Sequence, residues 1–212
     1  MATMPKGILG GFTGTIGPTV GAIWRCKDYV RSRSPRRKAG ISQKQLEQQL
    51  KFALVTRFQQ PLGGLLNQTF PYYKKDTTGA NRALSFNLRE AVCGTYPDYT
   101  INYSRFLISK GGLPNAEKPN ATAGGDGLVK FAWTNHAKWG TAGLNDKAVL
   151  VVYCPDMRQC VYTTEGPERA WEAASVDVPG FVGKTVQTWI GFISDSGKDV
   201  ATSVYTGEVI VT

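Results

Sequence analysis

The sequence contains a single histidine, His136, among its 212 residues. Histidine is the side chain whose ordinary pKa lies closest to neutral pH, so its scarcity leaves little material for general acid–base catalysis. His136 follows Asn135 in a polar stretch that we interpret as a surface loop. The carboxylates are scattered and form no pair that divides the roles of acid and base. We therefore expect a protein that is not an enzyme and has no catalytic residue.

Motifs for metals and cofactors are also missing. The four cysteines are Cys26, Cys93, Cys154 and Cys160, and their spacing does not match that of zinc ligands. The glycine-rich start has neither the Lys-Ser/Thr ending of a phosphate-binding loop nor the dinucleotide spacing. We expect no metal and no cofactor. Two interpretations of Cys154 and Cys160 stay open, namely free thiols in a reducing compartment or a disulfide across a hairpin.

No apolar run approaches the ~20 residues that span a bilayer, so we expect no membrane span. Residues 7–24 are uncharged and follow Lys6, as in a signal peptide. Their regular glycines and Pro18, however, make a poor apolar helix. We therefore expect cytoplasmic synthesis without a cleaved signal, with a virion as one destination.

Positive charge is concentrated in the first half of the chain. Residues 1–90 carry 15 Lys and Arg against 4 Asp and Glu, whereas residues 91–212 carry 10 against 12. Residues 25–38 alone hold seven basic side chains and one acid, Asp28. Three interpretations of this basic loop stay open: a solvated loop, a contact with an acidic protein surface, or nucleic-acid binding with Trp24 and Tyr29 as stacking aromatics. The candidate contact residues are Arg31, Arg33, Arg36, Arg37 and Lys38.

The N-terminal half, residues 1–110, predicts an extended hairpin followed by two helices. Residues 7–31 alternate apolar and small residues, and we expect two extended segments joined between Gly14 and Pro18. Ser42 has the position of a helix N-cap, and apolar residues at helical spacing follow it up to Phe58. Their buried face is expected to comprise Leu46, Leu50, Ala53, Leu54 and Phe58. A second helix is expected over residues 80–93, and a strand over 100–109.

The C-terminal half predicts a separate β domain. Residues 111–127 are rich in Asn, Ala, Pro and Gly, and we interpret them as a linker. Short strand patterns follow at residues 128–133, 147–153, 159–164, 175–178, 185–194 and 203–211. Their number and spacing favour an immunoglobulin-like or fibronectin-III-like β-sandwich over residues 128–212. The expected fold class is therefore α+β.

The glycine-rich arm is the candidate assembly element. Ile8, Phe12, Ile16 and Val20 recur at even spacing, so in one extended chain they would face the same side. A strand rich in glycine and apolar residues needs a partner, because the unpaired backbone groups of its edge otherwise promote aggregation. The partner is either a neighbouring subunit, completed by strand addition, or the arm's own domain.

Several motifs are distributed along the chain. They are Gly7-Ile8-Leu9-Gly10-Gly11-Phe12-Thr13-Gly14, Trp24 and Tyr29-Val30-Arg31-Ser32 near the start, and Gly94-Thr95-Tyr96-Pro97-Asp98-Tyr99 and Gly191-Phe192-Ile193-Ser194 further on. Together they resemble a family of small uncharacterised Bacteroidota proteins. The resemblance covers nearly the whole chain. It implies no activity and no catalytic residues, because the family has no established activity.

We expect a structural subunit that works by repeated protein–protein contacts, as in a phage-like virion or a surface assembly. Such a protein would be a homo-oligomer or bind other structural proteins. The alternative is a nucleic-acid-binding protein that uses the basic loop 25–38. A further alternative is a carbohydrate-binding sandwich with an exposed platform among Trp133, Trp139, Trp171 and Trp189.

Overall fold

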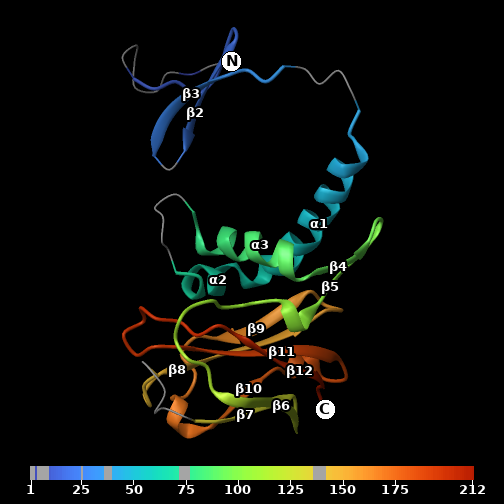
Figure 1. Cartoon of the computed structure of the whole chain (residues 1–212), viewed down its shortest axis with the longest axis vertical. Helices are drawn as coiled ribbons and strands as arrows, with labels where there is room; N and C mark the ends of the chain where they lie inside the picture. The colour runs from blue at the N-terminus through green and yellow to red at the C-terminus, as the bar shows by residue number, and fades with distance from the viewer. Residues whose placement is uncertain (1–2, 4–9, 25, 36–39, 72–76, 136–141) are drawn as a thin grey trace. The chain divides into compact units, whose positions relative to one another are not determined.

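The computed structural model describes residues 3, 10–24, 26–35, 40–71, 77–135 and 142–212. The chain divides into two compact units. We call Met1–Ser42 the N-terminal unit and Gln43–Thr212 the main unit. Figure 1 shows the path of the chain through both. Within the described residues, no helix has the length and apolar character needed to cross a membrane.

The N-terminal unit is a three-stranded antiparallel sheet in the order β1-β2-β3. Its strands are β1 (Gly14–Ile16), β2 (Thr19–Trp24) and β3 (Lys27–Ser32). Gly17 begins the first turn at φ 55°, a left-handed conformation that glycine adopts without strain. This confirms the expected reversal between Gly14 and Pro18. The chain reverses again at Cys26, so the second expected segment is in fact two paired strands.

The main unit begins with helices, as predicted. They are α1 (Gln43–Gln59), α2 (Gly63–Thr69) and α3 (Gly79–Glu90), with a 3-10 turn at Gln60–Leu62 between the first two. Pro61 lies at the start of that turn, where its missing N–H costs no hydrogen bond. The Thr78 hydroxyl caps α3 by accepting a hydrogen bond from the Asn81 N–H at 3.2 Å.

The buried face of α1 differs from the prediction. Leu46 and Leu50 are 37% and 42% exposed, and burial begins only with Val55 and Phe58. The apolar residues of α1 do not gather on one face over its whole length, and its members of the buried core begin at Val55. The expected strand at 100–109 also differs. It is shortened to β5 (Asp98–Ile101), which pairs with β4 (Val92–Thr95) before a 3-10 turn at Tyr103–Arg105.

The rest of the main unit is a β-sandwich of two antiparallel sheets. One sheet has the order β10-β7-β6, and the other has the order β12-β11-β8-β9. The strands are β6 (Glu117–Gly125), β7 (Leu128–Thr134), β8 (Lys147–Cys154), β9 (Gln159–Thr163), β10 (Ala173–Asp177), β11 (Thr185–Ile193) and β12 (Val204–Ile210). This division into three and four strands is that of a fibronectin-III-like sandwich, so the fold class is α+β as predicted.

The expected linker at 111–127 is wrong. Most of it forms β6, which pairs with β7 through a hairpin that turns at Asp126 and Gly127. The residues that suggested a linker are those that a tight hairpin needs, since Gly125, Asp126 and Gly127 all have positive φ. β6 is therefore the seventh strand of the sandwich, and no boundary falls here.

The helices and the sandwich share a core, which overturns the expected division between residues 1–110 and 128–212. The four-stranded sheet buries one face inside the sandwich and the other beneath the helices (Figure 1). Val149, Val151 and Trp189 are completely buried in the cluster that includes Phe58 and Leu66. Cutting the chain at 127 would expose this face, so residues 128–212 should not fold alone.

Candidate interaction surfaces

The register of the N-terminal sheet assigns every described strand residue to one of two faces. Directly opposed residues in antiparallel strands share a face, and successive residues alternate. Trp24 lies opposite Lys27, and Ala22 lies opposite Tyr29. Ile23, between Ala22 and Trp24, therefore faces the other side, where it lies opposite Asp28. The sheet thus presents two chemically different faces.

The first face, which we call the apolar face, carries large aliphatic residues that remain exposed. Ile16 is 43% exposed, Ile23 54% and Val30 61%. Phe12 crosses over this face, because a Cβ added to Gly21 would collide with the Phe12 carbonyl and ring. Gly11 lies against the Asp28 side chain on the same face, and Ile16, Ile23 and Val30 stay accessible beside this crossing segment.

The second face, which we call the basic–aromatic face, carries Trp24, Lys27, Tyr29 and Arg31. Trp24 is 51% exposed and Tyr29 44%. Lys27 and Arg31 are exposed, and Arg31 lies opposite Val20. The only acidic residue of the strand, Asp28, lies on the apolar face. Arg33 follows β3, where its backbone N–H donates to the Pro18 carbonyl at 2.7 Å.

The predicted assembly residues do not share one side. Ile16 lies opposite Thr19, so Val20, the next residue, points to the opposite face. Residues separated by an even number of positions share a face only along one uninterrupted strand. The two-residue turn after Ile16 reverses the chain, so the residues on either side of it no longer follow that spacing. Phe12 and Ile16 remain on the apolar face. Ile8, Arg36, Arg37 and Lys38 lie outside the described residues.

The described residues of the N-terminal sheet form almost no buried core. Among the described residues of the unit, only Gly21 is buried, and glycine has no side chain to pack. A three-stranded sheet needs a covered hydrophobic face for independent stability. The exposed aliphatic residues of the apolar face are the available material for such a cover.

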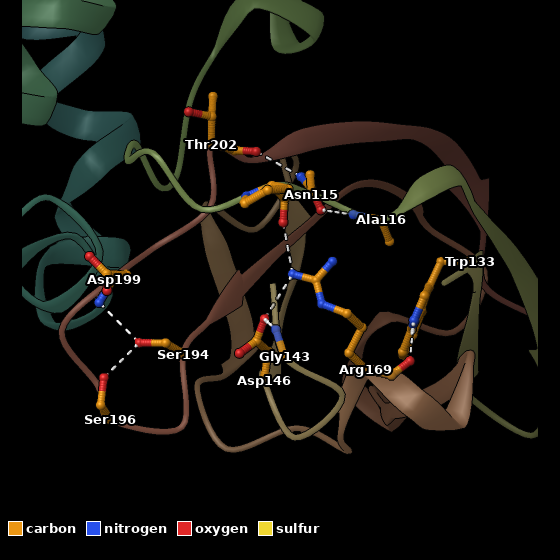
Figure 2. A network of polar contacts seen from close by, with 11 residues as sticks. Asn115, Ala116, Trp133, Gly143, Asp146, Arg169, Ser194, Ser196, Asp199 and Thr202 are labelled. Atoms are coloured by element: carbon orange, nitrogen blue, oxygen red, sulfur yellow. Dashed lines mark hydrogen bonds and ion pairs between the residues drawn. The ribbon is translucent and has the colours of Figure 1, made fainter. Parts of the chain in front are cut away.

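A buried ion pair organises one end of the sandwich (Figure 2). The Arg169 guanidinium lies 3.2 Å from Asp146 Oδ2 and donates to the Pro114 carbonyl at 2.8 Å. Its plane also lies over the Phe192 ring, 4.1 Å from the centroid. Burial lowers the pKa of Arg169, and the Asp146 carboxylate opposes that shift. The pair joins the segment that contains Arg169 to the Asp146 loop and the core.

The backbone around Arg169 supports an exposed tryptophan. The Trp133 Nε1–H donates to the Arg169 carbonyl at 3.0 Å, and the Trp133 backbone N–H donates to the Glu172 carbonyl at 3.0 Å. Trp171, between these anchored residues, is 71% exposed and borders a shallow hollow of about 690 Å³. The floor and rim of the hollow include Thr122, Lys130, Ala132, Ala173 and Ser175. Of the four tryptophans considered for a carbohydrate platform, Trp133 and Trp189 are buried, and Trp139 lies outside the described residues.

A second hollow of about 450 Å³ lies beside α1 and is lined by aromatic and basic side chains. Tyr99, Tyr103 and Tyr153 contribute the aromatic surface, and Arg57 and Arg158 the charge. Burial raises the pKa of Tyr153 to about 12, with the neighbouring Tyr103 as a further cause. The Tyr153 hydroxyl therefore stays protonated well above neutral pH.

The cysteines are free thiols in the structure. Cys160 lies opposite Tyr153 across β8 and β9, so Cys154 points to the other face of the sheet, into the sandwich core. This geometry excludes the hairpin disulfide. The Cys160 thiol instead donates to the Pro61 carbonyl at 3.3 Å, and burial raises its pKa to about 11. Within the described ranges, no three His, Cys, Asp or Glu side chains gather in a group that could hold a metal ion.

Comparison with known proteins identifies the family. The fold defines the class, an α+β protein built on a fibronectin-III-like sandwich. The chain belongs to the DUF6266 family, a family of unknown function whose model matches residues 11–207. The expectation of an uncharacterised family is thus confirmed. No curated protein matches the chain.

Two solved structures each resemble about half of the chain. The fibronectin type III domain of human collagen alpha-1(XX) chain is 11% identical, with a TM-score of 0.33, and the match covers 49% of this chain and 91% of that domain. The FN1–FN3 domains of chicken CNTN1 are 9% identical, with a TM-score of 0.36, and the match covers 49% of this chain and 36% of that one. At these values, the fold assignment rests on the sheet order rather than on overall superposition.

Proposed function

We propose that this protein is a non-enzymatic structural subunit that associates with copies of itself through the apolar face of its N-terminal sheet. The assembly would be repetitive, as in a phage-like virion or a surface array. The proposal rests on one observation, namely that the N-terminal unit buries little of its described surface while it exposes aliphatic side chains on one face. Its described residues bury only Gly21, yet Ile16, Ile23 and Val30 expose aliphatic surface on one face.

A second copy is the occupant that the surface chemistry favours. The apolar face exposes aliphatic side chains on either side of the segment that contains Phe12, and two such faces can cover each other when related by a twofold axis. Phe12, on the same face, offers an aromatic side chain that a second sheet can cover. The pairing would give each sheet a hydrophobic cover beyond the one that the described residues of its own unit provide.

The energy available from one contact is modest. Complete burial of a large aliphatic side chain contributes about 1.5–3 kcal/mol, and these residues are already about half covered. Each therefore adds roughly 1 kcal/mol on docking, and ordering and association costs offset much of the total. A twofold pairing of this face gives a dimer, and a repetitive assembly would join such dimers through a further contact, which would strengthen both contacts through avidity.

The test is whether polar substitutions on the apolar face lower the mass of the particles that the protein forms in solution. We expect Ile23→Ser combined with Val30→Ser to shift the protein to smaller species in light scattering. Ile210→Ser is the matched control, because Ile210 is 62% exposed on β12 of the sandwich. The control should keep the mass of the unsubstituted protein. Equal masses for the double variant and the unsubstituted protein would overturn the proposed role of this face.

A further inference from the structure

The strand register places the basic and aromatic residues of β3 on one face of the sheet and its acidic residue on the other. Lys27, Tyr29 and Arg31 point to one face, and Asp28, Val30 and Ser32 point to the other. On the first face, Trp24 of β2 lies opposite Lys27 and diagonal to Tyr29. Diagonal neighbours on one face of a sheet lie about 7–8 Å apart, so the two rings form one platform flanked by cations.

We propose that the basic–aromatic face binds single-stranded nucleic acid. Lys27 and Arg31 would neutralise backbone phosphates, and Trp24 and Tyr29 would stack on successive bases. An aromatic platform beside a positive groove is the arrangement that sequence-tolerant single-strand binders use. This binding goes beyond the proposed self-association and uses the opposite face of the same sheet, so the two functions do not compete for one surface.

The charge distribution favours a nucleic acid over a second copy of the chain as the partner of this face. Residues 1–42 carry eight Lys and Arg against one acid, whereas residues 43–212 carry 17 against 15. The main unit of a neighbouring copy is therefore close to neutral and provides little attraction for this surface. A polyanion with exposed rings satisfies both the cations and the aromatics.

Single strands are favoured over duplexes by the stacking residues. In a duplex the bases are already stacked on one another, so rings that lie on a flat sheet meet only sugar and phosphate. In a single strand the bases are accessible to Trp24 and Tyr29, which are about half exposed. Contacts between these rings and bases are the part of the interaction that a purely electrostatic surface would lack.

The experiment is fluorescence anisotropy of a labelled oligothymidylate, about 20 nucleotides long, titrated with the full chain at several salt concentrations. We expect affinity to fall steeply with salt. Lys27→Ser combined with Arg31→Ser should reduce the magnitude of the log–log slope by about 1.4, since each single-strand phosphate contact contributes about 0.7. Lys44→Ser combined with Lys198→Ser removes equal charge from exposed positions of the main unit and should leave the slope unchanged.

The aromatic variants separate stacking from general attraction to anions. Trp24→Ala and Tyr29→Ala should each weaken binding by about 5- to 150-fold, whereas Trp24→Phe and Tyr29→Phe should stay within a few-fold of the unsubstituted protein. The phenylalanine variants guard against loss of binding through misfolding. Ile23→Ser on the apolar face should keep binding of this short probe, whatever it does to the mass.

Four results of the oligonucleotide titrations would overturn the inference. They are the absence of binding at low salt, equal affinity for the corresponding duplex, full affinity of both alanine variants, and an unchanged slope without Lys27 and Arg31. Heparin binding that equals oligothymidylate binding in every variant would identify a general polyanion surface instead. Self-association is measured separately, through the mass of the unsubstituted protein and of the variant that combines Ile23→Ser with Val30→Ser, so its failure can be distinguished from a failure of binding.

Discussion

Lys27 lies directly opposite Trp24 across the β2–β3 hairpin, and the next residue, Asp28, lies opposite Ile23. The first pair shares the basic–aromatic face and the second shares the apolar face. A one-residue step along β3 therefore separates a cation beside an aromatic ring from an acid beside an aliphatic chain. This alternation lets one small sheet offer two surfaces, for which we propose two different partners.

The contact between Gly21 and Phe12 predicts the effect of a single methyl group. A Cβ at position 21 would collide with the Phe12 backbone and ring, whereas a Cβ at Gly40 would meet nothing within 4 Å. We expect Gly21→Ala to increase hydrogen exchange of the β1–β3 amides and to abolish both self-association and oligonucleotide binding. Gly40→Ala should leave all three unchanged. Equal exchange in the two variants would contradict the described packing of Phe12.

The Arg169–Asp146 pair predicts a large loss of stability when one partner is removed. Both side chains are buried, at 2% and 4% exposure, so Asp146→Ala leaves an unpaired cation inside the protein. We expect the free energy of unfolding in urea to fall by about 3–5 kcal/mol. Arg105→Ala, at an exposed position, should change it by less than about 0.5 kcal/mol. A loss below about 1 kcal/mol for Asp146→Ala would show that the pair does not hold this end of the sandwich.

Trp189 is buried and Trp171 is exposed, so replacing each by alanine should affect the free energy of unfolding very differently. Trp189 is completely buried, and its Nε1–H donates to the Phe106 carbonyl at 3.1 Å, so Trp189→Ala should cost about 3–5 kcal/mol. Trp171 is 71% exposed, so Trp171→Ala should change stability by less than about 0.5 kcal/mol. Denaturant unfolding measures both, with Trp189→Phe as a milder core variant. A large cost at Trp171 would mean that its ring supports the fold rather than remaining available for a ligand.

The raised pKa of Tyr153 predicts a loss of stability at alkaline pH. The ordinary value is 10.0 and the folded value is about 12, so the folded state holds the hydroxyl proton more tightly than the unfolded state does. The associated stability is complete below pH 10 and is lost as the pH rises towards 12, by an amount on the order of 2–3 kcal/mol. Unfolding measured across this range should show a shallower decline for Tyr153→Phe. Parallel declines would contradict the assignment to Tyr153.

Local patterns predicted most of the sandwich. All six strands expected after residue 127 exist, because alternation and flanking turn residues report directly on which face of a strand is buried. β6 was missed because its Asn, Ala and Gly residues have low strand propensity, and only pairing with β7 holds them extended. The exposed first half of α1 was missed because a helical spacing of a few leucines, such as Leu46 and Leu50, does not show whether another element covers them.

The candidate surfaces were predicted less well. The basic segment and its aromatics are visible in the sequence, but their separation onto one face depends on where the β2–β3 turn falls. The expected alignment of Ile16 with Val20 failed for the same reason at the first turn. The Arg169–Asp146 pair joins loops 23 positions apart, and no local pattern signals it.

The most direct test of the account is hydrogen exchange of the β1–β3 amides in the full chain as a function of protein concentration. If copies cover each other's apolar faces, these amides should become more protected as concentration rises, while amides of β11 in the main unit stay constant. Ile23→Ser combined with Val30→Ser should remove the concentration dependence. Protection of β1–β3 that is the same at every concentration, in a protein that stays at 23.1 kDa, would contradict the central claim.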